Sequence, residues 1–172
     1  MMPAHLNDRG IPALAALTLL LAACSGSVAE TPGVADVDGD IVTIDGTGTA
    51  PKMVVYKSPT CGCCSGWVEH MQRAGFDVDA IDTDDVESVK ADNGLLDPSL
   101  KSCHTALIDG YLIEGHVPAS AVQRLLRERP DVIGLTAPGM PVMSPGMGSE
   151  TPKDYSVLTF DETGSTEVFE RY

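Results

Sequence analysis

The chain has 172 residues, a formal net charge of −14 and only 5% aromatic residues. This length suggests one domain with additional segments. The strongly acidic balance favours solubility and argues against a nucleic-acid partner, because a phosphate backbone repels a surface of its own charge.

The N-terminal residues predict export. The run IPALAALTLLLAAC is apolar but too short to span a bilayer comfortably. Its last four residues, Leu21 to Cys24, resemble the lipobox of bacterial lipoprotein signal peptides. That resemblance implies a signal peptide over 1–23 and lipidation of Cys24, and a plain secretory signal is the alternative. We therefore expect an exported lipoprotein that faces the periplasm or the cell exterior and touches the membrane only through its lipid.

The segment that follows predicts a tether. Residues 24–50 are rich in glycine and acidic residues and contain no lysine, arginine or aromatic residue. Such a composition favours a flexible, solvated chain. The folded domain is therefore expected over residues 51–172.

From residue 53 the sequence predicts alternating strands and helices. Asp109-Gly110, between two apolar runs, is a strong hairpin signal. The expected order is a strand at 53–58, a helix at 64–75, a strand at 76–82, a helix at 84–94, a hairpin at 104–116, a helix at 119–129, a Gly/Pro/Met loop at 134–152 and two strands at 155–160 and 166–172. This order predicts an α/β fold: a small sheet with flanking helices on both faces and an additional C-terminal β-hairpin.

Four cysteines remain besides Cys24, and three of them lie within four residues: Cys61, Cys63, Cys64 and, further along, Cys103. Disulfides persist in exported proteins, but such crowding is poorly suited to linking distant segments. Cys61 is expected in the turn after the first strand and Cys64 at the start of the next helix, where the helix dipole favours thiolate. A thiolate is both the nucleophile of disulfide exchange and the form that binds metal. The location therefore predicts reactive sulfur, but it does not distinguish disulfide exchange from metal binding.

Three motifs carry a family resemblance: SPTCGCC, SCHTALIDGYLIEGHVPA and PGMPVMSPGM, spread over roughly residues 52–150. They resemble the CopG copper-resistance proteins, a family of exported bacterial proteins. The C-x-x-C of Cys61 and Cys64, followed by a helix and a later hairpin, looks like a thioredoxin fold. The resemblance implies handling of copper in the periplasm, by binding it, by thiol redox chemistry or both, with other periplasmic copper proteins as partners.

The residues before the hairpin predict a metal site. Thioredoxin-like oxidoreductases usually carry a cis-proline there, whereas this chain has Cys103-His104-Thr105. Cys103 and His104 are candidate metal ligands, and they would face Cys61 and Cys64. His116, at the end of the hairpin, would approach the same edge. This pattern is more typical of metal binding than of peptide exchange.

The identity of the metal depends on ligand type and spacing. Thiolates with imidazole suit both Zn(II) and Cu(I). Thiols as crowded as Cys61, Cys63 and Cys64 cannot readily take separate corners of one tetrahedron. Bridging thiolates in a multinuclear cluster remove that constraint, which favours Cu(I), with zinc as the alternative.

Methionines in the Gly/Pro-rich loop are further candidates. Thioether sulfur is a soft, uncharged donor that disulfide formation does not consume. Met140 and Met147 are therefore candidate ligands with Met143 between them, and covering the core is their alternative role. Trp67 and Met71 fit the buried face of a helix, and His70 is expected on the surface.

Taken together with the family resemblance, which implies copper tolerance, the sequence predicts a copper-binding lipoprotein that holds Cu(I) with Cys and His ligands. Two alternatives remain. One is a thiol–disulfide oxidoreductase that uses Cys61 and Cys64 as its redox pair, and the other is an adaptor with a structural zinc site. The chain contains no phosphate-cradling glycine loop, G-x-S-x-G elbow or H-E-x-x-H sequence, so hydrolase and nucleotide-binding functions are not supported.

Overall fold

The computed structural model describes residues 51–172, so the predicted signal peptide, Cys24 and the tether lie outside the described residues. The elements are β1 (Met53–Lys57), α1 (Gly62–Arg73), β2 (Val78–Asp82), α2 (Val86–Asp92), the 3₁₀ helix η1 (Pro98–Leu100), β3 (Thr105–Ile108), β4 (Tyr111–Gly115), α3 (Ala119–Glu128), β5 (Gly134–Ala137), β6 (Ser156–Phe160) and β7 (Thr166–Arg171). None of the helices within 51–172 is long and apolar enough to cross a membrane.

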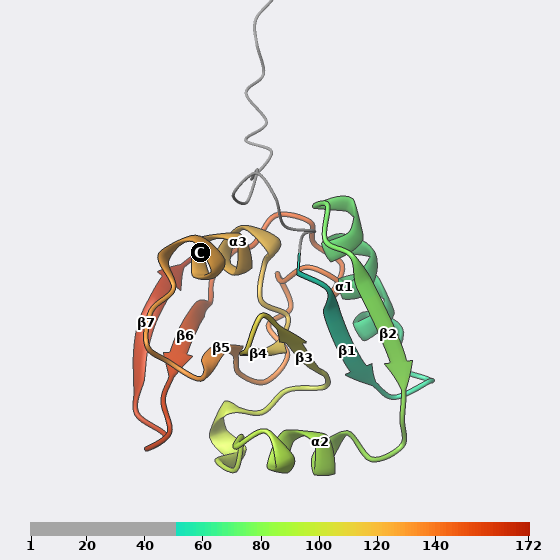
Figure 1. The fold of residues 1–172 in the computed structure, drawn as a ribbon. Helices are drawn as coiled ribbons and strands as arrows, with labels where there is room; N and C mark the ends of the chain where they lie inside the picture. The colour runs from blue at the N-terminus through green and yellow to red at the C-terminus, as the bar shows by residue number, and fades with distance from the viewer. Residues whose placement is uncertain (1–50) are drawn as a thin grey trace, which may run out of the picture. The chain divides into compact units, whose positions relative to one another are not determined.

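The strands within residues 51–172 form one sheet with the order β2-β1-β3-β4-β5-β6-β7 (Figure 1). The β1–β2 and β4–β5 pairs are parallel, and the other neighbours are antiparallel. The predicted α/β class and the C-terminal hairpin, β6–β7, are confirmed. The more specific thioredoxin-like assignment stays a prediction.

Helices cover both faces of the sheet, as predicted. On one face α1 and α3 pack in the main core, where Trp67 and Leu125 are fully buried against strand residues such as Ile113. On the other face, the side of α2 in Figure 1, a smaller cluster includes Leu95 and Leu112. Ile113 and Leu112 are neighbours on β4, so this strand supplies apolar side chains to both faces, as the alternation of a strand requires.

The β3–β4 hairpin follows the predicted turn chemistry. Both turn residues have positive φ, 50° for Asp109 and 85° for Gly110. A two-residue turn of this kind matches the twist of the flanking strands and favours Asp-Gly. The turn fixes the pairing of Thr105 with Glu114 at the opposite end of the hairpin, next to Cys103 and His104.

One element contradicts the sequence prediction: residues 134–137, expected as loop, form β5. Gly134, which indicated a loop, instead allows close backbone approach, because a Cβ atom there would overlap the Leu112 carbonyl. All four residues are buried between β4 and β6. A short strand paired on both sides shows no polar alternation, so the pattern could not reveal it.

This close approach has a measurable consequence. Gly134→Ala is expected to lower the free energy of unfolding by about 3 kcal/mol, because the backbone of a central strand pair cannot move to accept a methyl group. Chemical denaturation followed by circular dichroism measures the loss. The control is Gly62→Ala, whose added methyl group meets nothing within 4 Å and should leave stability unchanged or slightly higher. Equal stability of Gly134→Ala and the original chain would contradict the packing described.

Candidate metal centre

The cysteine motif lies where β1 gives way to α1. The chain turns after Lys57, and Cys61 is the N-cap of α1, its Sγ accepting the Cys64 amide at 3.3 Å. Cys61 and Cys64 form a disulfide, and Cys63 remains a free thiol with its Sγ 3.5 Å from that of Cys61. The predicted placement of all three residues around a helix N-terminus therefore agrees with the structure.

The Cys103-His104 segment reaches this motif from the start of β3. The Sγ atom of Cys64 lies 3.9 Å from the Cys103 carbonyl oxygen. The Cys103 thiol is half-buried, and its sulfur lies 3.4 Å from His104 Nδ1 and 3.2 Å from His116 Nε2. The residues before and after the hairpin thus meet at one sulfur atom.

Six of the predicted metal ligands fall into two overlapping groups. The first is Cys61, Cys63, Cys64 and Cys103, and the second is Cys103, His104 and His116. Within each group the potential ligand atoms lie within 4.8 Å of one another. Cys103 belongs to both groups, so its sulfur joins the thiol side of the centre to the imidazole side.

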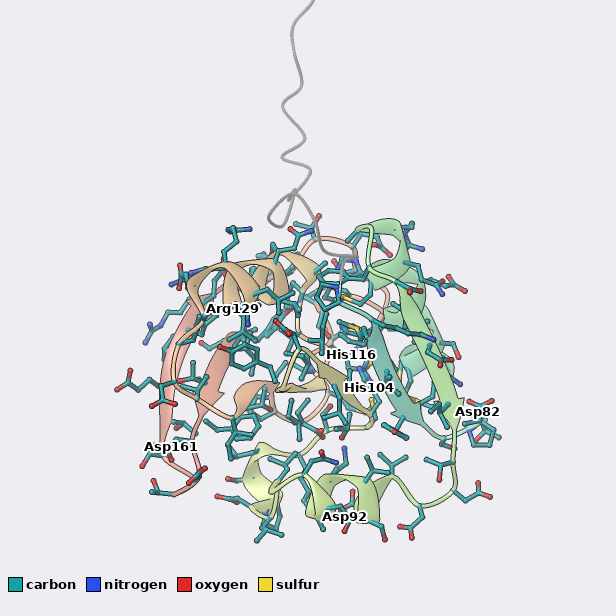
Figure 2. The ribbon with its side chains drawn as sticks, in the orientation of Figure 1. Asp82, Asp92, His104, His116, Arg129 and Asp161 are labelled. Carbon is teal, nitrogen blue, oxygen red and sulfur yellow. A yellow bond between two sulfur atoms is a disulfide. The ribbon has the colours of Figure 1, made fainter. Side chains whose placement is uncertain are left out.

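Both histidines are fully buried (Figure 2). Their rings pack edge to face at 5.0 Å, and the ring of His104 also lies 4.5 Å from that of Trp67. Burial lowers the pKa of each imidazole, and for His104 the neighbouring His116 and Lys90 lower the pKa further. Both rings are therefore neutral at pH 7, which is the form that binds metal.

The tautomer of His116 is set by the Gly/Pro/Met loop. Its Nδ1 lies 2.7 Å from the Pro145 carbonyl oxygen, which can only accept, so Nδ1 carries the proton. The lone pair of Nε2 then faces the Cys103 sulfur. Outer hydrogen bonds of this kind orient metal-binding histidines. His104 differs, since its buried Nε2 has no hydrogen-bond partner in the described part of the chain.

The loop also contacts α1 directly. Gly146 has a φ of 84°, and a Cβ atom there would overlap backbone atoms of Cys63 and Trp67. Met147 follows at a half-buried position, whereas the side chain of Met140 is 52% exposed. The loop thus holds the centre through its backbone, and the role of Met140 and Met147 as ligands stays a prediction.

A thiol in these surroundings holds its proton. Burial raises the pKa of the Cys103 thiol to about 12, and the nearby Cys63 adds to the rise. The sulfur is therefore a thiol at pH 7 in the metal-free protein. A metal ion that binds there must displace the proton.

Sequence reasoning missed a buried ion pair behind the centre. Lys90 of α2 lies 2.5 Å from Glu114 of β4, and the two side chains are 1% and 0% exposed. Glu114 also accepts from Thr105 and from the Ser102 amide. The available signal was a single acidic residue in the otherwise apolar run YLIEG, at the position that shares the buried face of Leu112.

The structure also contradicts the prediction that His70 lies on the surface. Its side chain is only 15% exposed. Its Nε2 accepts the Ala119 amide at 3.1 Å, while Nδ1 lies 3.3 Å from a carboxylate oxygen of Glu150. Helix α3 begins after Pro118 and has no side-chain cap of its own, so His70 satisfies an amide that a capping residue otherwise would.

The donor set has a clear chemical character. Thiolate and neutral imidazole are soft or intermediate donors, which select ions such as Zn(II) and Cu(I) over hard cations. In the disulfide state Cys61 and Cys64 offer no thiolate, so reduction of this bond makes two further sulfur ligands available. The same pair can also exchange electrons as a dithiol–disulfide couple.

Comparisons with known proteins place the chain in a family. A family model described as "Protein of unknown function, DUF411" matches residues 100–147, which include Cys103, His104 and His116. Two solved structures are described as "Copper resistance protein copG- Form 2" and "Copper resistance protein copG- Form 1". Each is 39% identical to this chain with a TM-score of 0.66 and covers 72% of it, and the match spans 99% and 98% of those chains. No curated protein matches the chain significantly. With this identity over nearly the full length of both structures, the chain belongs to the CopG family of copper-resistance proteins.

Proposed function

We propose that this protein binds Cu(I) as its cargo at the cysteine–histidine centre and thereby contributes to copper tolerance. The observation that carries the proposal is the convergence of three cysteine sulfurs and two buried imidazoles on the sulfur of Cys103. The two related structures, both of copper resistance proteins, support the choice of copper.

The number of donors favours Cu(I) over zinc. Four cysteine sulfurs and two imidazoles lie in two overlapping groups, and one tetrahedral zinc ion takes only four ligands. Cuprous ions readily form thiolate-bridged clusters. A multinuclear cluster is therefore the proposed form of the cargo.

A coupled redox role is part of the proposal. Because Cys61 and Cys64 form a disulfide, the reduced pair can give up two electrons and return to this state. Two Cu(II) ions would each take one electron, forming two Cu(I) ions, one disulfide and two released protons. The Cu(I) ions formed in this way can bind to Cys61 and Cys64 only while a thiol reductant keeps these two cysteines in the reduced state.

The place of action is proposed from the sequence. The lipobox at Cys24 supports an exported lipoprotein that acts at the membrane surface and passes copper to other periplasmic copper proteins. Thioredoxin-like disulfide exchange on other proteins, with Cys61 and Cys64 as the redox pair, is the second candidate function, and the disulfide is the observation that favours it.

A structural zinc site is disfavoured by the core. Trp67, Ile113 and Leu125 are fully buried in an apolar cluster that spans α1, α3 and the sheet. A core of this kind supports folding without metal, whereas small zinc domains unfold when the metal is removed. We therefore expect the metal-free protein to stay folded.

The proposal is tested by competition between the two metals. The reduced chain is titrated under argon with Cu(I) and, separately, with Zn(II), each against a coloured chelator, while circular dichroism follows the fold. Preferential Cu(I) binding by a protein that is folded without metal supports the proposal. Preferential Zn(II) binding by a protein that unfolds when zinc is removed contradicts it.

The affinity for Cu(I) should rise with pH. Since the pKa of Cys103 is about 12, a proton occupies this sulfur throughout the range from pH 6.5 to 8 and competes with the metal. Each displaced proton strengthens apparent binding by about tenfold per pH unit. Burial lowers the pKa of His104 and His116, so neutral imidazoles should add little to this slope above pH 7. The titration repeated across this range measures the slope, and a pH-independent affinity would contradict the role of Cys103.

A further inference from the structure

We infer that Glu114 is a positioning residue for the Cys103-His104 dipeptide, held in place by Lys90. The inference rests on the proposed function. Glu114 acts through the backbone on either side of the two ligands, from the face of the sheet covered by α2.

The two carboxylate oxygens of Glu114 hold the chain before and after the ligands. The Ser102 amide donates to Oε1 at 2.6 Å, and the Thr105 hydroxyl donates to Oε2 at 2.5 Å. Ser102 directly precedes Cys103, and Thr105 directly follows His104. One buried side chain thus fixes both ends of the dipeptide.

Lys90 fixes the carboxylate in turn. Its Nζ donates to Glu114 Oε1 at 2.5 Å and to the Thr105 hydroxyl at 2.8 Å. It enters from α2, so this helix is linked to the ligand segment by buried hydrogen bonds. In the metal-free chain the positions of Cys103 and His104 are therefore set before any ion arrives.

Backbone contacts complete the arrangement. Gly115, next to Glu114, donates its amide to the His104 carbonyl at 3.0 Å. A Cβ atom at Gly115 would overlap the side chain of Ser102, so glycine permits the approach. Ser102 also donates its hydroxyl to the Gly139 carbonyl, which ties the dipeptide to the start of the Gly/Pro/Met loop.

Stability alone does not account for a buried ion pair. Well-packed apolar residues of similar volume often replace such pairs without loss of stability. A fully hydrogen-bonded polar network in the core instead fixes one arrangement of the groups around it. Here the group it fixes is the segment with two candidate ligands.

The test replaces both Lys90 and Glu114, so that no unpaired charge is left in the core. The double variant Lys90→Met/Glu114→Met is expected to stay folded but to bind Cu(I) about 10–100-fold more weakly, the usual loss when outer-shell partners are removed. The variant Lys90→Met/Glu114→Gln keeps an amide oxygen for the Ser102 amide and should recover most of the affinity. The matched control is Leu112→Ala, on the same strand and face, which should cost stability but leave the Cu(I) affinity unchanged.

A second readout is independent of copper. The backbone amide resonances of Cys103 and His104 in the reduced, metal-free protein should shift or broaden in Lys90→Met/Glu114→Met but not in Leu112→Ala. If the double methionine variant does not fold, Thr105→Val removes one anchor, keeps the ion pair, and should give the same shifts with about a tenfold loss of affinity.

The outcomes separate the two proposals. If the original chain does not bind Cu(I), the proposed function fails, while the resonances still decide whether Glu114 positions the dipeptide. If the original chain binds Cu(I) and the double methionine variant, or Thr105→Val where that variant does not fold, keeps both its affinity and its resonances, the inference about Glu114 is overturned. A loss no greater than that of Leu112→Ala also overturns it.

Discussion

Cys103→Ser is expected to weaken Cu(I) binding by more than about a hundredfold. Loss of a residue that only orients a metal ligand already costs up to about a hundredfold, and Cys103 is proposed as a direct ligand. Cys103 belongs to both ligand groups, with His116 Nε2 at 3.2 Å from its sulfur. A serine hydroxyl is a hard, neutral donor that Cu(I) does not favour. The measurement is an anaerobic titration of the reduced chain against a coloured Cu(I) chelator.

His104→Ala should show a comparable loss in the same titration, and His70→Gln is its matched control. His70 is also partly buried and hydrogen-bonded, but it lies against α3 and Glu150 and belongs to neither ligand group. The control should keep full affinity even if it is less stable. Full affinity of Cys103→Ser would instead show that the cysteines serve electron exchange, as in the oxidoreductase alternative.

Oxidation of the Cys61–Cys64 pair is expected to have a similarly large effect. The disulfide removes two thiolates from the first ligand group, so the oxidised chain should bind Cu(I) at least about a hundredfold more weakly than the reduced chain. Thiol counting establishes the redox state of each sample before it is titrated under argon.

The control for this effect is the double variant Cys61→Ser/Cys64→Ser, which cannot form the disulfide. Its affinity, although weak, should be the same after oxidising and reducing treatment. Equal affinity of the oxidised and reduced forms of the original chain would mean that Cys61 and Cys64 are not copper ligands. In that event, the reduction potential of the pair becomes the quantity to measure.

The sequence predicts much of the fold because its signals are local. Asp109-Gly110 specifies the hairpin turn, and both residues adopt the positive φ that this turn requires. The predicted end of the first helix at residue 75 is also local, because Gly75 follows the C-cap of α1 with positive φ. Strand β5 was missed because Gly134 serves a contact with β4, a requirement that arises only when distant segments meet.

The candidate site likewise combines residues that local patterns predict with residues that only contacts between distant segments bring together. Cys61, Cys63 and Cys64 could be placed from a strand followed by a helix, and the hairpin brings Cys103 and His116 together. The Lys90–Glu114 pair and the Pro145 carbonyl at His116 depend on contacts between residues 24 and 29 positions apart. No local pattern encodes such contacts, so the groups that orient the ligands emerge only from the folded chain.

Cu(I) binding at the cysteine–histidine centre is tested most directly by X-ray absorption at the copper edge of the reduced chain loaded anaerobically with Cu(I). We predict copper in the cuprous state, bound mainly by sulfur with a contribution from imidazole nitrogen. The sulfur contribution should fall in Cys103→Ser. A copper shell made only of oxygen and nitrogen atoms would contradict the claim that this cysteine–histidine centre holds the metal.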